Sequence, residues 1–185
     1  MKENHEFFLD MIRKRSAMAA AAGALVKFKE KQLDIVNRVQ DNYIYFVSNI
    51  RQFYMRGGAG TGKTWIAIKM ANAEAENGAR VLLTCKSKAL SAVMKNETSD
   101  AVDVIDLESL RENTPAGSYD AIFVDEAQDF SEEDAFNLKT YLKDEKASRL
   151  GVFYDDVQKV RAESFGDAFM IDTPPLLSVS YTHLR

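Results

Sequence analysis

One eight-residue stretch constrains the fold of this chain more than any other feature. Residues 57–64 read Gly-Gly-Ala-Gly-Thr-Gly-Lys-Thr and fit the pattern G-x-x-x-x-G-K-[ST]. A strand-like run from Gln52 to Arg56 precedes the stretch, and a helix-favouring run from Lys63 to Glu76 follows it. Glycines let backbone N–H groups turn inward around phosphate oxygens, and the start of a helix adds a positive end. The sequence therefore predicts a phosphate-binding loop between a strand and a helix.

The side chains of this loop have separate expected roles. The Lys63 ammonium is expected to reach the β- and γ-phosphates of a nucleotide, and the Thr64 hydroxyl is expected to ligate Mg²⁺. The residues expected to bind the nucleotide are Gly57, Gly58, Ala59, Gly60, Thr61, Gly62, Lys63 and Thr64.

The residues after the loop follow the order of an α/β protein. The helix from Lys63 to Glu76 is closed by Asn77-Gly78, and a strand is predicted from Arg80 to Thr84. Short and nearly continuous apolar runs, typical of parallel strands covered on both faces, recur at Val102–Ile105, Ala121–Val124 and Leu150–Tyr154. The predicted fold class is α/β, a P-loop NTPase with a mainly parallel sheet flanked by helices.

The chain before the loop is expected to be helical at first. Good helix formers predict an N-terminal helix from Glu6 to Ala24 and a second helix from about Lys29 to Val39, with Asp41-Asn42 as its end. Aromatic and β-branched residues at Tyr43–Val47 and Gln52–Met55 then favour two strands.

A second chemical pattern follows the apolar run that starts at Ala121. Residues 121–129 read AIFVDEAQD, which places Asp125 at the carboxyl edge of a strand, where open α/β sheets bind ligands. We expect Asp125 to be a magnesium ligand and Glu126 to orient or deprotonate the water that attacks the γ-phosphate. The alternative is a solvated acidic turn before a helix capped near Ser131, and that interpretation is preferred for the later acids Glu132, Glu133 and Asp134.

A third and weaker signal lies at the end of the last clear strand. Gln158 follows Asp155 by three residues there, and such a glutamine can hydrogen-bond the γ-phosphate or its attacking water. A surface turn is the alternative.

Composition limits the other classes of function. The 185 residues, at 20.8 kDa, suit one domain, and the net charge of -4 means that nucleic-acid contact would need a local basic patch. One cysteine, Cys85, excludes an internal disulfide and favours a reducing, cytoplasmic location. No export signal is recognised, and the apolar stretch from Ala17 to Val26 is too short to span a membrane.

Together these motifs resemble the first RecA-like domain of UvrD-like superfamily 1 DNA helicases, especially the compact kind found with nuclease-related domains. Residues 125–129 look like the D-E-A-Q-D form of motif II, and residues 57–64 look like motif I. The resemblance covers residues 28–177, with residues 1–27 as an N-terminal helical extension. It implies an ATP-hydrolysing motor that uses ATP and Mg²⁺ and acts on single-stranded DNA.

The resemblance also implies roles for residues outside these two motifs. Gln32 would be the glutamine that reads the adenine, and Asp155 with Gln158 would form motif III. Residues 84–90 look like motif Ia, so Thr84, Lys86 and Lys88 would contact the single-strand backbone.

The sequence departs from the family in three places. Ser87 replaces the usual asparagine of motif Ia, and too few residues separate Thr84 from Asp125 for the accessory subdomain of full-length members. The chain is expected to lack the second RecA-like domain, whose arginine stabilises the transition state in the family, so we expect it to bind ATP far better than it hydrolyses it. Residues 179–185 resemble a translated sequencing-adapter tail, and residues 178–185 would then be a non-native tail.

Two other functions stay open from the sequence. One is a P-loop kinase or nucleotide switch that does not act on nucleic acid, although no N-K-x-D string for guanine and no arginine-rich lid are evident. The other is an inert fragment that binds nucleotide and does nothing further.

Overall fold

The computed structural model describes residues 27, 29, 31, 38, 41–155, 169, 171, 176 and 177. The chain divides into two compact units, Met1–Asn42 and Tyr43–Arg185. In the first unit the described residues are helical. The second unit contains the sheet, the loop and both acidic motif residues.

The second unit alternates strands and helices in chain order. The strands are β1 (Gln52–Arg56), β2 (Val81–Cys85), β3 (Val102–Asp106), β4 (Ala121–Val124), β5 (Arg149–Tyr154) and the two-residue β6 (Leu176–Leu177). The helices are α2 (Lys63–Glu76), α3 (Lys88–Glu97), α4 (Leu107–Asn113) and α5 (Glu132–Lys139), with a short 3₁₀ helix η1 (Ala127–Asp129).

The strands form one sheet in the order β3-β2-β4-β5-β1-β6, and each of the pairings among the described residues is parallel. Parallel strands bring their carboxyl ends to the same edge of a sheet. The loop after β1, the acidic pair after β4 and the residues after β5 therefore meet at one edge. The predicted α/β class is confirmed.

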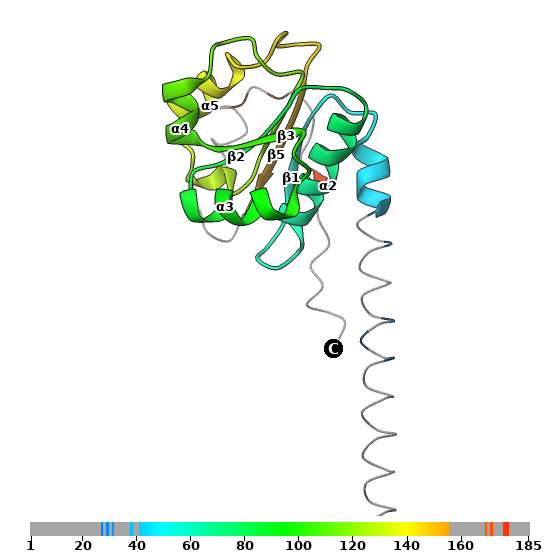
Figure 1. Cartoon of the computed structure of the whole chain (residues 1–185). Helices are drawn as coiled ribbons and strands as arrows, with labels where there is room; N and C mark the ends of the chain where they lie inside the picture. Colours follow the sequence, from blue (N-terminus) through cyan, green and yellow to red (C-terminus); the bar gives the residue numbers. More distant parts are fainter. Residues whose placement is uncertain are drawn as a thin grey trace, which may run out of the picture. The chain divides into compact units, whose positions relative to one another are not determined.

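Helices cover both faces of the sheet (Figure 1). On one face α2 and α3 pack their apolar side chains, such as Ile66 and Met94, against Phe53, Leu83 and Phe123 of the strands. On the other face, side chains of α4, η1 and α5 pack against residues that include Leu82 and Ile122. Burial on both faces explains why the strand sequences are nearly continuous apolar runs.

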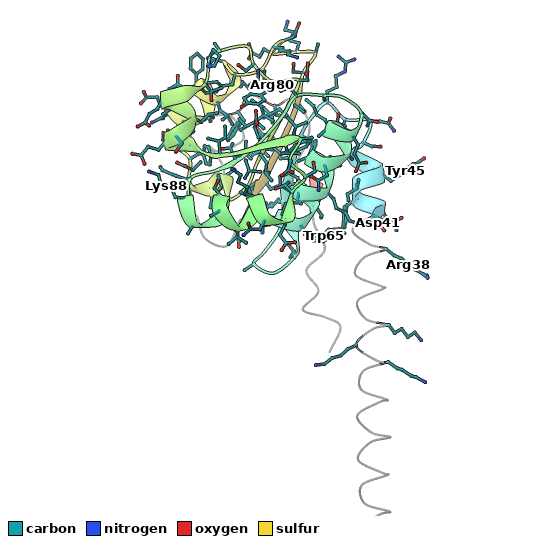
Figure 2. All side chains as sticks on the ribbon, viewed as in Figure 1. Arg38, Asp41, Tyr45, Trp65, Arg80 and Lys88 are labelled. Carbon is teal, nitrogen blue, oxygen red and sulfur yellow. The ribbon has the colours of Figure 1, made fainter. Side chains whose placement is uncertain are left out.

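One expected strand is wrong. Residues 41–47 are helical, so Tyr43–Val47 does not pair with the strand that follows, and Asp41-Asn42 does not end a helix. Val47 is fully buried, and Tyr43 and Ile44 pack against the same cluster of core residues. These positions recur at the spacing of one helix face, and Tyr45 points outward in Figure 2. Burial of this stripe overrides the strand preference of the aromatic side chains.

The other strands predicted for the second unit and the helix predicted at Lys63–Glu76 lie where the sequence places them, with ends that differ by a residue or so. The helices α3 and α4 and the short strand β6 have no counterpart among the sequence predictions. Four expectations fall on residues that the structure does not describe: the helix at Glu6–Ala24, the roles of Gln32 and Gln158, and the nature of residues 178–185. Among the described residues, no helix is long and apolar enough to cross a membrane.

Candidate functional site

The loop after β1 is anchored to the middle of the sheet. The Gly57 N–H donates to the Tyr154 carbonyl at the end of β5, with 3.2 Å between nitrogen and oxygen. Two later loop residues, Gly60 with φ 75° and Gly62 with φ 81°, adopt the left-handed conformation that glycine accepts without strain. Gly60 and Gly62 are therefore needed for the path of the chain through the loop.

The Lys63 side chain closes the loop from within. Its Nζ donates to the Gly57 carbonyl at 2.7 Å and to the Gly58 carbonyl at 3.0 Å, and the residue is 6% exposed. The Thr61 hydroxyl also donates to the Gly58 carbonyl, at 2.9 Å. The ammonium is thus held inside the loop, where a bound phosphate would meet it.

The first turn of α2 offers unpaired N–H donors to that phosphate. Its N-cap residue is Gly62, which has no side chain to satisfy these donors, and no acidic residue lies in the first turn. The other α-helix starts of the second unit that the structure describes are capped by side chains, namely Ser87 at α3, Asp106 at α4 and Ser131 at α5. The uncapped start of α2 matches an anion site.

Asp125 lies at the end of β4, fully buried. Its backbone N–H donates to the Thr84 carbonyl at 2.9 Å, but neither carboxylate oxygen has a hydrogen-bond partner among the described residues. Burial raises the pKa of Asp125 to about 6. The nearby Thr64 hydroxyl lowers this pKa somewhat, although it is not placed to form a hydrogen bond with either carboxylate oxygen. A buried carboxylate with two unused oxygens next to a hydroxyl is a donor set that fits Mg²⁺.

Glu126 has an unusual backbone conformation, and its carboxylate accepts a hydrogen bond. It has φ 50° and ψ 43°, and no other residue except glycine has a positive φ in the described part of the chain. The Gln128 amide donates from Nε2 to the Glu126 Oε2, and its Oε1 accepts from the Asp155 N–H at 2.9 Å. Strained backbone of this kind is found at functional sites, where the surrounding structure maintains it.

Sequence reasoning did not assign a role to Gln128. The residue lies two positions after Glu126 in the D-E-A-Q-D string, so the sequence shows that the two are close along the chain. No pattern in the sequence shows that the Gln128 amide reaches the residue that follows β5. That contact joins residues 27 positions apart.

The three residues expected to contact nucleic acid differ in exposure. The Thr84 side chain is fully buried, and its hydroxyl has no partner among the described residues. The side chains of Lys86 and Lys88 are 51% and 66% exposed, and Figure 2 shows Lys88 at the surface. Both lysines form ion pairs with acidic side chains. The Lys86 Nζ lies 3.6 Å from the Asp134 Oδ2, and the Lys88 Nζ lies 2.9 Å from the Glu108 Oε2.

A family model described as an AAA domain matches residues 30–163. This range covers most of the chain and includes the loop, the acidic pair and β5. The chain belongs to the AAA domain family. No curated protein is similar enough to count as a match.

The family and the geometry agree on the coarse chemistry. This AAA domain is a P-loop NTPase domain, of a family associated with superfamily 1 helicases. Its loop, its buried aspartate and the neighbouring glutamate meet at one sheet edge.

Proposed function

We propose that this AAA domain is the ATP-binding and ATP-hydrolysing motor domain of a UvrD-like superfamily 1 DNA helicase or translocase, equivalent to its first RecA-like domain. Its proposed partners are single-stranded DNA and a second RecA-like domain. A single cysteine suits the reducing cytoplasm as its proposed location.

The observation that carries the proposal is the position of β5 between β1 and β4. The end of β5 touches the phosphate loop through Tyr154 and the acidic turn through Asp155. A motor must convert the state of its nucleotide into movement of a neighbouring segment. A strand end that contacts both parts of the site supports such a role, and a site that only bound nucleotide would not need it.

The residues of the site divide the work of hydrolysis. Lys63 and the backbone N–H groups of the loop would bind the phosphates, and Thr64 with Asp125 would hold Mg²⁺, which neutralises phosphate charge when bound. Glu126 would accept the proton of the attacking water, for which it must lie within hydrogen-bond reach. Gln32 and Gln158 keep their expected roles at the adenine and the γ-phosphate.

The test is calorimetry with ATP and with GTP in the presence of Mg²⁺, on the 185-residue chain and on Lys63→Ala. We expect ATP binding in the micromolar range that is lost in Lys63→Ala, because the variant removes the cation that faces the phosphates. Turnover is then measured with and without single-stranded DNA, and we expect it to be slow and insensitive to DNA without a second RecA-like domain.

Two other outcomes would contradict the proposal. Failure of the chain to bind ATP would mean that the loop does not assemble a working site. Rapid turnover that DNA does not change would instead favour a kinase or nucleotide switch. Adding a second RecA-like domain should accelerate turnover in the helicase class only.

A further inference from the structure

Gln128 is a buried side chain that connects the turn after β4 to the residue that follows β5. It belongs to η1, after β4, and it is 3% exposed. Its amide has one partner on each side: the Glu126 carboxylate accepts from Nε2, and the Asp155 N–H donates to Oε1 at 2.9 Å. Asp155 is the residue that directly follows β5, and it is also 3% exposed.

The chemistry of these partners fixes the orientation of the amide. A flipped amide would place its NH₂ group against the Asp155 N–H and its oxygen against the Glu126 carboxylate. Both contacts would then be repulsive, in a buried place where an unpaired donor or acceptor destabilises the fold. The amide is therefore a rigid bridge with a single favourable orientation.

The Gln128 bridge restricts the position of the Glu126 carboxylate. The left-handed backbone of Glu126 sets the direction in which its side chain leaves the chain, and the Gln128 amide then fixes one carboxylate oxygen. Because Oε1 of the same amide accepts from the Asp155 N–H, a displacement of Asp155 would shift the amide and with it the carboxylate.

We propose that Gln128 is a positioning residue for hydrolysis, which holds the Glu126 carboxylate in place and couples it to the end of β5. This inference rests on the proposed function, because it assumes that Glu126 acts on the attacking water. Gln128 needs no contact with nucleotide in this role. It acts through Glu126, and misplacement of a catalytic group by about 1 Å costs up to roughly 100-fold in rate.

Two variants of the 185-residue chain separate the two ends of the bridge. Gln128→Glu retains an oxygen for the Asp155 N–H but replaces the donor to Glu126 with a second carboxylate. Gln128→Met has similar bulk and removes both hydrogen bonds. Gln52→Met is the matched control, because Gln52 lies at the start of β1, away from this sheet edge, where it donates to the Glu145 carbonyl.

The first readout is independent of hydrolysis. Amide hydrogen exchange at Asp155, followed by NMR, is expected to stay slow in Gln128→Glu and in the control, and to become at least tenfold faster in Gln128→Met. Equal exchange in all four proteins would overturn the contact between Gln128 and β5.

The second readout is the split between affinity and rate. ATP affinity by calorimetry should stay within about twofold in both Gln128 variants, while the single-turnover rate of hydrolysis falls roughly 10- to 100-fold. Unchanged rates in variants that still bind ATP would overturn the inference, and so would a parallel loss of affinity and folding, because that result would indicate a structural role only. Failure of the unaltered chain to bind ATP would refute the proposed function instead, so the two failures are distinguishable.

Discussion

At the scale of single residues, Asp125 links the site to the stability of the fold. Burial raises its pKa to about 6 from an ordinary value of 3.8, so the folded chain holds this proton more tightly than the unfolded chain does. Below about pH 4 the carboxyl is protonated in both states, so it does not change the free energy of unfolding. This free energy decreases as the pH rises from about 4 to 6, and it stays lower above pH 6. The full loss is about 3 kcal/mol at most.

Asp125→Asn cannot ionise, so this part of the pH dependence should disappear in the variant. The measurement is urea denaturation of both proteins between pH 4 and pH 8, without Mg²⁺ or nucleotide. Parallel stability curves for the two proteins over this range would show that the carboxyl titrates normally, contrary to the expectation.

The backbone strain at Glu126 can be measured by comparing two variants of this residue. Its φ of 50° brings the Cβ of any residue except glycine into an unfavourable position, at a cost of roughly 1 to 2 kcal/mol. Glu126→Gly and Glu126→Ala both remove the carboxylate, and only the glycine variant removes the strain. We expect Glu126→Gly to unfold at a higher urea concentration than Glu126→Ala, and we expect both to lose hydrolysis while still binding ATP. An alanine variant at least as stable as the glycine variant would mean that this conformation carries no strain.

At this scale the sequence predicts the path of the loop between β1 and α2 but not the contacts of Gln128. Residues 57–64 form a local pattern whose backbone path follows from its own glycines. The role of Gln128 depends on a hydrogen bond to Asp155, and therefore on which strands are neighbours. Local patterns carry no information about that.

At the scale of elements, residues 41–47 show why one prediction failed. Counting aromatic and β-branched side chains favours a strand there, whereas the spacing of the partly buried Tyr43 and Ile44 and the buried Val47 favours a helix. The two signals conflict in a short segment, and packing against the sheet decides between them.

The middle of β5 gives a prediction at the same scale. Gly151 pairs with Phe53 on β1 and lies opposite Phe123 on β4, and a Cβ added to it would lie 2.7 Å from a ring atom of each. The two rings fill the space above the glycine, so Gly151→Ala forces at least one ring to move. Overpacking of this kind costs about 1 to 3 kcal/mol, and we expect the loss in urea denaturation.

Gly58→Ala is the matched control for β5. A Cβ at Gly58 has no neighbour within 4 Å, and its backbone is not left-handed, so the variant should unfold within about 0.5 kcal/mol of the unaltered chain. Equal stability of Gly151→Ala and Gly58→Ala would mean that the rings over β5 adjust without cost.

At the scale of the whole molecule, the order of the strands is the least predictable feature and the most informative one. The sequence predicts parallel strands but cannot place β5 between β1 and β4, because both pairings join segments far apart in the chain. That order brings Tyr154 to the loop and Asp155 to the acidic turn, and the proposed motor function depends on it.

The charge of the whole molecule determines how any nucleic acid would bind. The net charge of -4 provides no general attraction, and the exposed lysines of the expected strand-binding segment, Lys86 and Lys88, already have acidic partners. Binding of single-stranded DNA by these residues should therefore be weak. Its affinity should fall with increasing salt concentration by the amount expected for about two phosphate contacts. For single strands, that gives a slope of about -1.4 in a plot of log affinity against log salt.

Fluorescence anisotropy with a labelled oligonucleotide, between low and physiological salt, measures this slope. Each of Lys86→Gln and Lys88→Gln should make it shallower by about 0.7, because each removes one phosphate contact. Lys143→Gln provides the control, since Lys143 is also exposed and paired with an acid, Asp120, but lies outside the proposed strand-binding segment. A steep slope that neither variant changes would assign the contacts to other basic residues. The absence of binding even at low salt would argue against single-stranded DNA as a ligand of this domain on its own.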